Sequence, residues 1–124
     1  MQTAASNANS VHIMGSSFSA DLTAVIRGAN RDLDLTLRMD YDNNSSNLLR
    51  RSDQWPFLQR RVPAVFLHTG LHPDYHTTFD RPERIDYAKI ERIARLVYQA
   101  SWDLARKDSR PAMRQQREIP PAQE

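Results

Sequence analysis

The segment Leu33–Met39 alternates apolar and polar residues at every step. This period of two is the strongest strand signal in the chain and predicts a β-strand with one buried face. A second run, Val62–Leu67, is continuously apolar and contains β-branched and aromatic residues, as expected of a strand buried on both faces. A shorter strand is expected at Val11–Met14, where Gly15 ends it. These segments constrain the chain to fold around a β-sheet.

Apolar residues at helical spacing separate the strands. One helix is expected across residues 20–30, opened by Ser19 or Ser17, and the longest is expected at about 87–106, after the capping residue Asp86. The residues expected on the buried faces are Leu22, Val25, Ile26 and Ala29 in the first helix, and Ile90, Ile93, Val97, Ala100 or Ser101, and Leu104 in the second.

A short helix is expected at 54–60, with Ser52 or Asp53 as its cap and Pro56 in its first turn. The resulting order of elements is β-α-β-α-β-loop-α. This alternation predicts an α/β layer architecture with a mostly parallel sheet. Three strands are few for such a sheet, since a sheet in a globular protein commonly holds about five or six.

The composition fits one globular domain. The chain has 124 residues and a mass of 14.3 kDa, with 40% apolar and 26% charged residues. It contains no cysteine, so disulfide scaffolds, thiolate zinc sites and cysteine nucleophiles are excluded. Lys and Arg number 17 against 15 Asp and Glu. Acidic residues are interspersed among the arginines, so a nucleic-acid-binding surface is not expected.

The two ends of the chain are polar. Residues 1–10 have neither the cationic start nor the apolar core of a signal peptide and are expected to form a polar lead-in. Residues 107–124 contain three prolines and are expected to form a flexible tail. No apolar stretch approaches the roughly 20 residues of a membrane-spanning helix. The structured part is therefore expected at residues 11–106.

Three of the four histidines, His68, His72 and His76, follow one another at a spacing of four residues. On a helix they would share one face, as metal-binding histidines do. Gly70 and Pro73 prevent a helix here, so a long loop is expected and the spacing alone is a weak indication of a metal site. Loop histidines also satisfy local backbone groups, and both interpretations stay open.

The same loop contains Asp74, Tyr75 and His76 in succession, followed by Asp80. An imidazole is a zinc ligand, and a nearby carboxylate orients it through its other ring nitrogen. A phenol beside a metal donates a hydrogen bond to a developing oxyanion. The alternative is that the two aspartates form turns and that Tyr75 packs against its neighbours. A long loop after a buried strand is a typical location of a functional site in an α/β protein.

Several motifs occur in order over about residues 50–105, with weaker similarity back to about residue 11. They are Ser52-Asp-Gln-Trp-Pro-Phe57, Val62-Pro-Ala-Val-Phe-Leu-His-Thr-Gly70, His72-Pro-Asp-Tyr-His-Thr77 and Asp80-Arg-Pro-Glu-Arg-Ile-Asp86. Together they resemble the C-terminal part of zinc-dependent exopeptidases of the bacterial leucyl aminopeptidase and glutamate carboxypeptidase group, peptidase family twenty-eight of clan MH. Two departures from the pattern of that group are Gln54, where His is common, and Arg81, where Thr is common.

The resemblance implies a three-layer, phosphorylase/hydrolase-like α/β sandwich, of which this chain holds a partial domain. It implies a centre of two zinc ions that activates a water to cleave a peptide substrate. His76 matches a metal ligand of that centre, and Tyr75 matches a residue that contacts the tetrahedral intermediate in some members. The further site candidates are Ser52, Asp53 and His72 for the substrate, and Asp80 for orienting a metal ligand.

The motifs that supply the other ligands and the general base in this group are missing: the sequence contains no N-terminal His-x-Asp, no Glu-Glu pair and no Asp-Met segment. We therefore expect the chain to be the C-terminal portion of a larger metal-dependent exopeptidase and to be inactive alone. A sheet without its upstream strands has an open edge, so a homo-oligomer through that edge is expected. The resemblance also implies export, because relatives are often exported. The alternative is a non-catalytic α/β domain that retains the fold for binding or assembly.

Overall fold

The computed structural model describes residues 8–39, 42 and 47–115. Within them, β1 (Ser10–Met14), β2 (Thr36–Arg38) and β3 (Phe66–His68) form a three-stranded sheet in the order β2-β1-β3. Three α-helices accompany the sheet: α1 (Ala20–Ala29), α2 (Trp55–Gln59) and α3 (Tyr87–Ala105). Short 3-10 helices precede them at η2 (Ser16–Phe18), η3 (Leu48–Arg50) and η4 (Pro82–Arg84). The expected order of strands and helices and the α/β fold class are confirmed.

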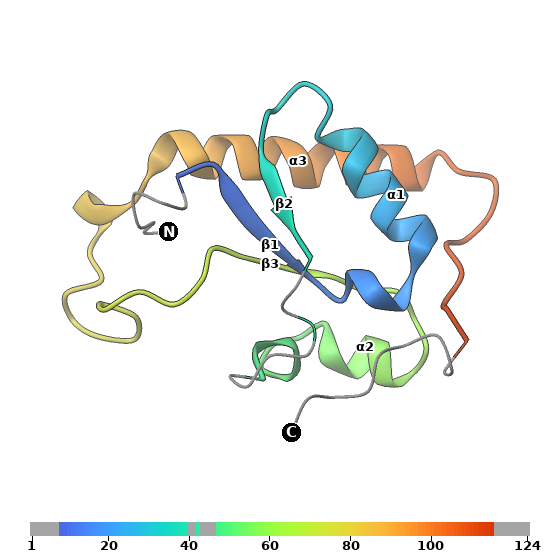
Figure 1. Cartoon of the computed structure of the whole chain (residues 1–124), viewed down its shortest axis with the longest axis horizontal. Coiled ribbons are helices and arrows are strands. Elements are labelled where there is room, and N and C mark those ends of the chain that lie inside the picture. Colours follow the sequence, from blue (N-terminus) through green and yellow to red (C-terminus); the bar gives the residue numbers. More distant parts are fainter. Residues whose placement is uncertain (1–7, 40–41, 43–46, 116–124) are drawn as a thin grey trace.

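Strand β1 is the centre of the sheet. It runs parallel to β2, with Val11 opposite Leu37, and antiparallel to β3, with His12 opposite His68. The expectation of a mostly parallel sheet is therefore wrong for the described strands. The physical reason is the route of the chain: α2 lies near the end where β1 and β2 finish, so β3 starts there and runs back along β1 (Figure 1).

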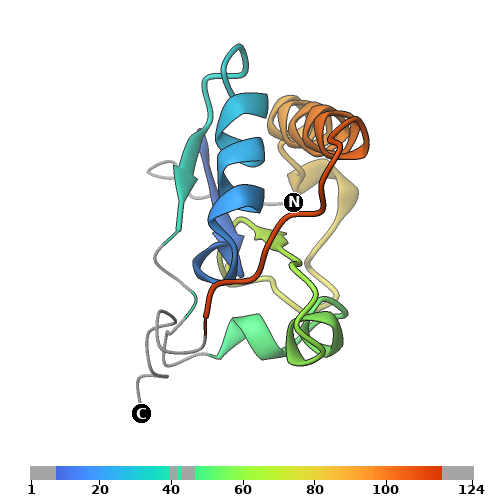
Figure 2. The same ribbon diagram turned by 90° about the vertical axis from the view of Figure 1, so that its right-hand side faces the viewer.

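The sheet has helices on two sides. In Figure 1, α3 lies above the sheet and α2 lies below it, and Figure 2 shows α1 and α3 close together. All of β1 is buried, and its successive side chains point to opposite faces. Val11 and Ile13 pack in the core cluster that includes residues of α1 and α3, whereas Met14 packs with Leu58 of α2 and Leu48. The described residues thus form a small three-layer arrangement.

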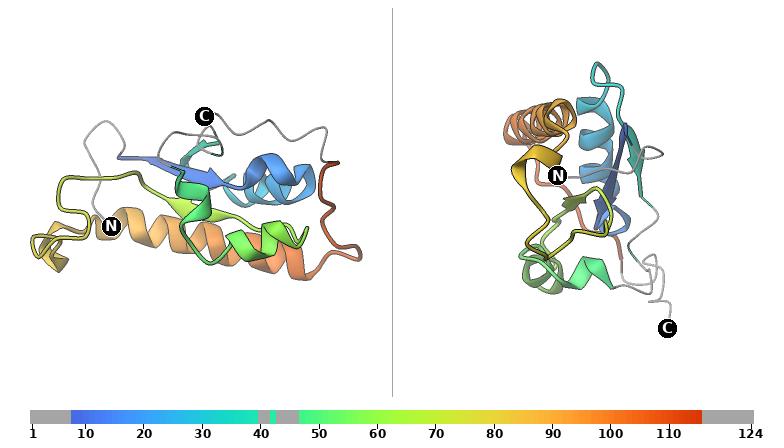
Figure 3. Two further views of the ribbon diagram at one scale, coloured as in Figure 1. Left: turned by 90° about the horizontal axis from the view of Figure 1, so that it is seen from below. Right: turned by 90° about the vertical axis from the view of Figure 1, so that its left-hand side faces the viewer.

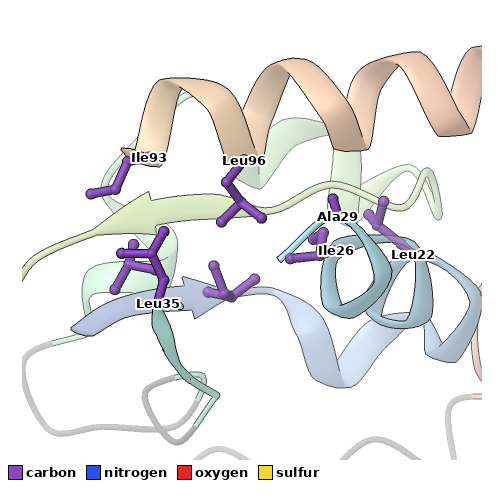
Figure 4. Packing of buried hydrophobic residues seen from close by; sticks show 8 residues of the cluster. Leu22, Ile26, Ala29, Leu35, Ile93 and Leu96 are labelled. Carbon is purple, nitrogen blue, oxygen red and sulfur yellow. The ribbon is translucent and has the colours of Figure 1, made fainter. Parts of the chain in front are cut away.

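The larger core cluster joins β1, α1 and α3 (Figure 4). It consists of Val11, Ile13, Leu22, Ile26, Ala29, Leu35, Ile93 and Leu96. The expected buried face of α1 is confirmed, because Leu22, Val25, Ile26 and Ala29 are all buried. Ser19 caps this helix, since its Oγ accepts a hydrogen bond from the Leu22 N–H at 3.2 Å.

The long helix α3 runs along the length of the molecule (Figure 3). It begins after Asp86, whose Oδ1 accepts a hydrogen bond from the Lys89 N–H at 3.0 Å, as expected of an N-cap. The buried face is rotated from the expected one: Leu96 is buried, whereas Val97 is 44% exposed. The two residues are adjacent, and the contacts of α3 with α1 and the sheet select Leu96 for burial. The expectation that Val97 belongs to the buried face is wrong.

Strands β2 and β3 are shorter than their sequence patterns predict. The backbone of Asp34 is left-handed, with φ 54°, so the strand begins at Thr36 rather than at Leu33. The apolar run at 62–67 contributes only its last residues to β3, and all of β3 is half-buried. The expectation of burial on both faces is wrong because β3 is at the edge of the described sheet, with β1 on one side only.

Helix α2 begins one residue later than expected and without the predicted cap. Gln54 is the N-cap residue and makes no capping hydrogen bond with its side chain, so neither Ser52 nor Asp53 caps the helix. The Gln54 amide instead donates to the Leu49 carbonyl in the preceding 3-10 helix. None of the helices within the described ranges is long and apolar enough to cross a membrane.

The first part of the expected tail contacts the folded body. Arg114 N–H donates to the Phe18 carbonyl at 2.8 Å, and Ser19 Oγ donates to the Ala112 carbonyl at 2.7 Å. Residues 107–115 therefore lie against the turn before α1, without helix or strand of their own. The rest of the expected tail, 116–124, and most of the expected lead-in, 1–7, lie outside the described residues.

Candidate functional site

The loop between β3 and η4 contains most of the predicted site residues. It is built from successive tight turns, closed by hydrogen bonds from the N–H groups of Tyr75, Thr77 and Asp80 to the carbonyls of His72, Asp74 and Thr77. A chain of short turns explains why the expected loop contains neither helix nor strand.

His76 lies within the turn that Asp74 and Thr77 close. Its backbone is left-handed, with φ 58°, and its side chain is exposed. The His76 ring stacks on the Tyr75 ring, with centroids 4.0 Å apart and planes 16° apart. A stacked, exposed imidazole has a defined orientation and remains accessible from solvent.

Tyr75 lies among all three loop histidines. Besides the stack with His76, its ring contacts those of His72 and His68 edge to face, at centroid distances of 6.0 and 6.5 Å. His68 is in turn the cross-strand partner of the buried His12 on β1. The rings of the three loop histidines therefore gather around Tyr75, and His68 joins them to His12 in the middle of β1, which the spacing of the loop histidines alone did not establish.

His68 makes a local backbone contact. Its Nδ1 accepts a hydrogen bond from the Gly70 N–H at 2.8 Å, so the neutral ring carries its proton on Nε2. Burial lowers the pKa of His68 below its ordinary value, and the nearby His72 lowers it further. For His68, the interpretation that loop histidines satisfy local backbone groups is confirmed, and neither ring nitrogen offers a free lone pair to a metal in this conformation.

Asp80 lies beside His72. Its Oδ2 is 3.9 Å from His72 Nε2, and the exposed fraction of the His72 side chain is 15%. The His72 Nδ1 is buried without a hydrogen-bond partner among the described residues. Asp74, the other loop carboxylate, accepts a hydrogen bond from Arg84 Nη1 at 3.1 Å. Both aspartates thus contact cationic or imidazole side chains.

The remaining substrate-site candidates come from a different element. Ser52 and Asp53 precede α2, which lies at some distance from the loop in Figure 1. The Ser52 carbonyl accepts a hydrogen bond from the Trp55 N–H at 3.2 Å, and Asp53 is exposed. The side chain of Trp55 packs against the smaller core cluster with the Arg50 guanidinium 5.0 Å from its ring centroid, so it serves packing.

Asp42 is a polar residue whose role sequence patterns missed. Its carboxylate accepts hydrogen bonds from the N–H groups of Gly15 and Ser17, at 2.6 and 2.9 Å, and from the Ser17 hydroxyl. It therefore fixes the turn between β1 and α1. No local signal predicts this contact, because the partners are 27 and 25 positions apart in the sequence.

The sequence model of peptidase family M28 matches residues 1–101. The chain belongs to this family. Its M28 membership makes it a relative of peptidases, which are hydrolases of peptide bonds. The matched region includes β3, the histidine loop and most of α3. No curated protein and no solved structure matches the chain significantly.

The described residues of this M28 chain do not by themselves form the zinc centre that the resemblance implies. A catalytic zinc ion is held by three protein ligands with one open position. Among residues 8–39, 42 and 47–115, no group of three or more His, Cys, Asp or Glu side chains is arranged to hold a metal ion. His76 is a candidate for one ligand, and the loop as a whole does not fit the complete metal centre.

Proposed function

We propose that this chain is the C-terminal portion of a metal-dependent exopeptidase and that His76 contributes one ligand to its zinc centre. The observation that carries the proposal is the position of His76. It lies in the region matched by the M28 model, and its ring is exposed on a turn of defined geometry. The neighbouring His68 accepts a backbone hydrogen bond and remains a less suitable ligand.

Tyr75 is the second residue of this proposal. Its ring supports the His76 imidazole, and the residue is 36% exposed. We assign its phenol the role of a hydrogen-bond donor to the carbonyl oxygen of a bound peptide. A bound zinc ion supplies Lewis-acid polarisation and a water of lowered pKa. Ser52, Asp53 and His72 remain candidates for the substrate site, and Asp80 remains a candidate for orienting a ligand.

The chain alone is proposed to be inactive. One ligand does not hold zinc in a catalytic geometry, and within the described ranges no group of three or more His, Cys, Asp or Glu side chains is arranged to hold the ion. The test is an assay of the purified chain with aminoacyl p-nitroanilides and added zinc, with and without a chelator. We expect the rate of hydrolysis to equal that of a blank that contains zinc but no protein. Chelator-sensitive turnover that His76→Ala abolishes would contradict the inactivity and support the role of His76.

The role of His76 has its own experiment. If the coding sequence continues upstream in frame with the missing ligand motifs, the longer protein should bind zinc. Its His76→Ala variant should then hold less zinc after dialysis, while His12→Ala, which lacks a matching motif, should retain the wild-type content. Equal zinc contents in wild type and His76→Ala would overturn the assignment of His76.

A non-catalytic α/β domain for binding or assembly is the second candidate function. The absence of a three-ligand group among the described residues favours it for the chain as it stands. An upstream reading frame without His-x-Asp, Glu-Glu and Asp-Met motifs would support this candidate over the peptidase. An upstream reading frame that contains those motifs would contradict the non-catalytic function.

A further inference from the structure

One ion pair ties the turn that presents His76 to the rest of the fold. Arg84 Nη1 lies 3.1 Å from Asp74 Oδ2. Asp74 opens the turn, and Arg84 is the last residue of η4, shortly before α3 begins. The helix α3 is fixed in the core by Ile93 and Leu96. The ion pair therefore links the candidate ligand's turn to the segment that leads into α3.

Further hydrogen bonds hold the turn internally. The N–H and the Oγ of Thr77 both donate to the Asp74 carbonyl, at 3.0 and 2.7 Å. Asp74 thus accepts three hydrogen bonds, two on its backbone and one on its side chain. His76 lies between Asp74 and Thr77 with φ 58°, a left-handed conformation that a residue other than glycine adopts at a cost. Such a conformation persists only where the surrounding contacts impose it.

We propose that Arg84 is a positioning residue for His76. Its ion pair with Asp74 keeps the turn in the conformation that stacks the His76 ring on Tyr75 and leaves it exposed. The Asp74 side chain is 18% exposed and the Arg84 side chain is 60% exposed, so the carboxylate is half-buried while the guanidinium remains open to solvent. The inference rests on the proposed function, in which His76 is a metal ligand, and it extends that function to Arg84, which lies outside the segment His72–Thr77.

The first readout is the environment of the His76 ring in the full chain without added metal. Because the two rings stack at 4.0 Å, the ring current of Tyr75 displaces the NMR resonances of the His76 ring protons upfield. In Arg84→Gln we expect this displacement to be lost, so that the resonances move to the positions of an unstructured histidine. Comparison with His76→Gln assigns the resonances. Loss of the displacement reports on the orientation of His76 rather than on the stability of the fold.

The second readout is proteolysis of the loop. Chymotrypsin cleaves after exposed aromatic residues, and the loop offers Tyr75 and Phe79. An ion pair of this type changes the population of the open loop up to about fivefold, so cleavage of Arg84→Gln should accelerate by up to about that factor. Arg84→Lys retains a cation and should restore both the resonances and the slow cleavage.

The matched control is Arg95→Gln, because Arg95 also pairs with a carboxylate, Glu91, at 2.8 Å within α3. We expect both readouts to be unchanged in this variant. An Arg84→Gln chain with unchanged His76 resonances and cleavage would overturn the proposal, as would an equal effect of Arg95→Gln. These outcomes differ from a failure of the proposed function. If His76 does not bind zinc, its role as a ligand is lost, but the effect of Arg84 on the turn can still be measured.

Discussion

Gly15 and Ala64 approach each other so closely that a side chain has no room between them. A Cβ added at Gly15 would overlap the Ala64 carbonyl oxygen, and the backbone of Gly15 is left-handed, with φ 96°. Gly15 directly follows β1, and Ala64 lies just before β3. The contact therefore fixes the place where the chain leaves the central strand and turns into α1.

Gly15→Ala is predicted to destabilise the chain by at least about 2 kcal/mol, because the new methyl group meets backbone and the positive φ is unfavourable for alanine. The measurement is the free energy of unfolding in urea. The matched control is Gly28→Ala in α1, where an added Cβ has no atom within 4 Å. That change should stabilise the chain by about 0.5–1 kcal/mol, since alanine is the better helix former. Equal effects of the two substitutions would contradict the prediction.

Asp42→Asn is predicted to cost about 1–2 kcal/mol of stability. The carboxylate accepts hydrogen bonds from the N–H groups of Gly15 and Ser17, and an amide has one acceptor oxygen in place of two. Urea unfolding measures the loss. Asp53→Asn removes a carboxylate at an exposed position and should change the stability by less than about 0.5 kcal/mol. A neutral effect of Asp42→Asn would show that the turn after β1 holds without this carboxylate.

Stability is predicted to fall on acidification through the protonation of His68. Burial, aided by His72, lowers the pKa of His68 below its ordinary 6.5. Between the lowered pKa and 6.5 the unfolded chain binds more protons than the folded chain, so the contribution is fully present above pH 6.5 and is lost as the pH falls. Urea midpoints at several pH values measure this slope. The His68→Asn variant should show a smaller slope, because asparagine can accept the hydrogen bond from the Gly70 N–H without titrating. An unchanged slope would show that other groups cause the pH dependence.

The homo-oligomer expected from the sequence stays a prediction, and the outer edge of β3 is where we expect it to form. The run 62–67 has no charged side chain, whereas the opposite edge strand, β2, has an exposed Arg38. Uncharged edges invite pairing with another chain. Sedimentation velocity over a concentration series should therefore show a dimer. A monomer at every concentration would contradict the expectation.

A matched pair of variants separates edge pairing from general surface attraction. Val62 precedes β3 and is 46% exposed, and Val97 lies on α3 and is 44% exposed. Val62→Lys places a charge beside the edge and should weaken the dimer about tenfold, whereas Val97→Lys should leave it unchanged. Equal weakening by both variants would assign the association to apolar surface in general rather than to the strand edge.

The candidate site shows where prediction from the sequence stops. The motif around Tyr75 and His76 was visible in the sequence, because the family pattern is contiguous there. The contact of Asp74 with Arg84, ten positions away, was not visible. The lone pair of His68 is used by the Gly70 N–H, and this use depends on the angle at which the chain leaves β3. A sequence motif identifies the residue types of a site, whereas the tautomer and the hydrogen-bond partners of each side chain depend on the surrounding backbone.

The sequence by itself determined α1 and α3, with Asp86 as one cap and Ser19 or Ser17 as the other, because capping and helical periodicity involve residues within a few positions of one another. It also located the loop, since glycine and proline restrict the backbone locally. Only the tertiary structure decided that β3 is an antiparallel edge strand and that Leu96 is buried in place of Val97. The reason is that strand pairing, and the choice of which adjacent apolar residue is buried, depend on packing between segments far apart in the sequence. The free energy of that packing cannot be read from a short segment.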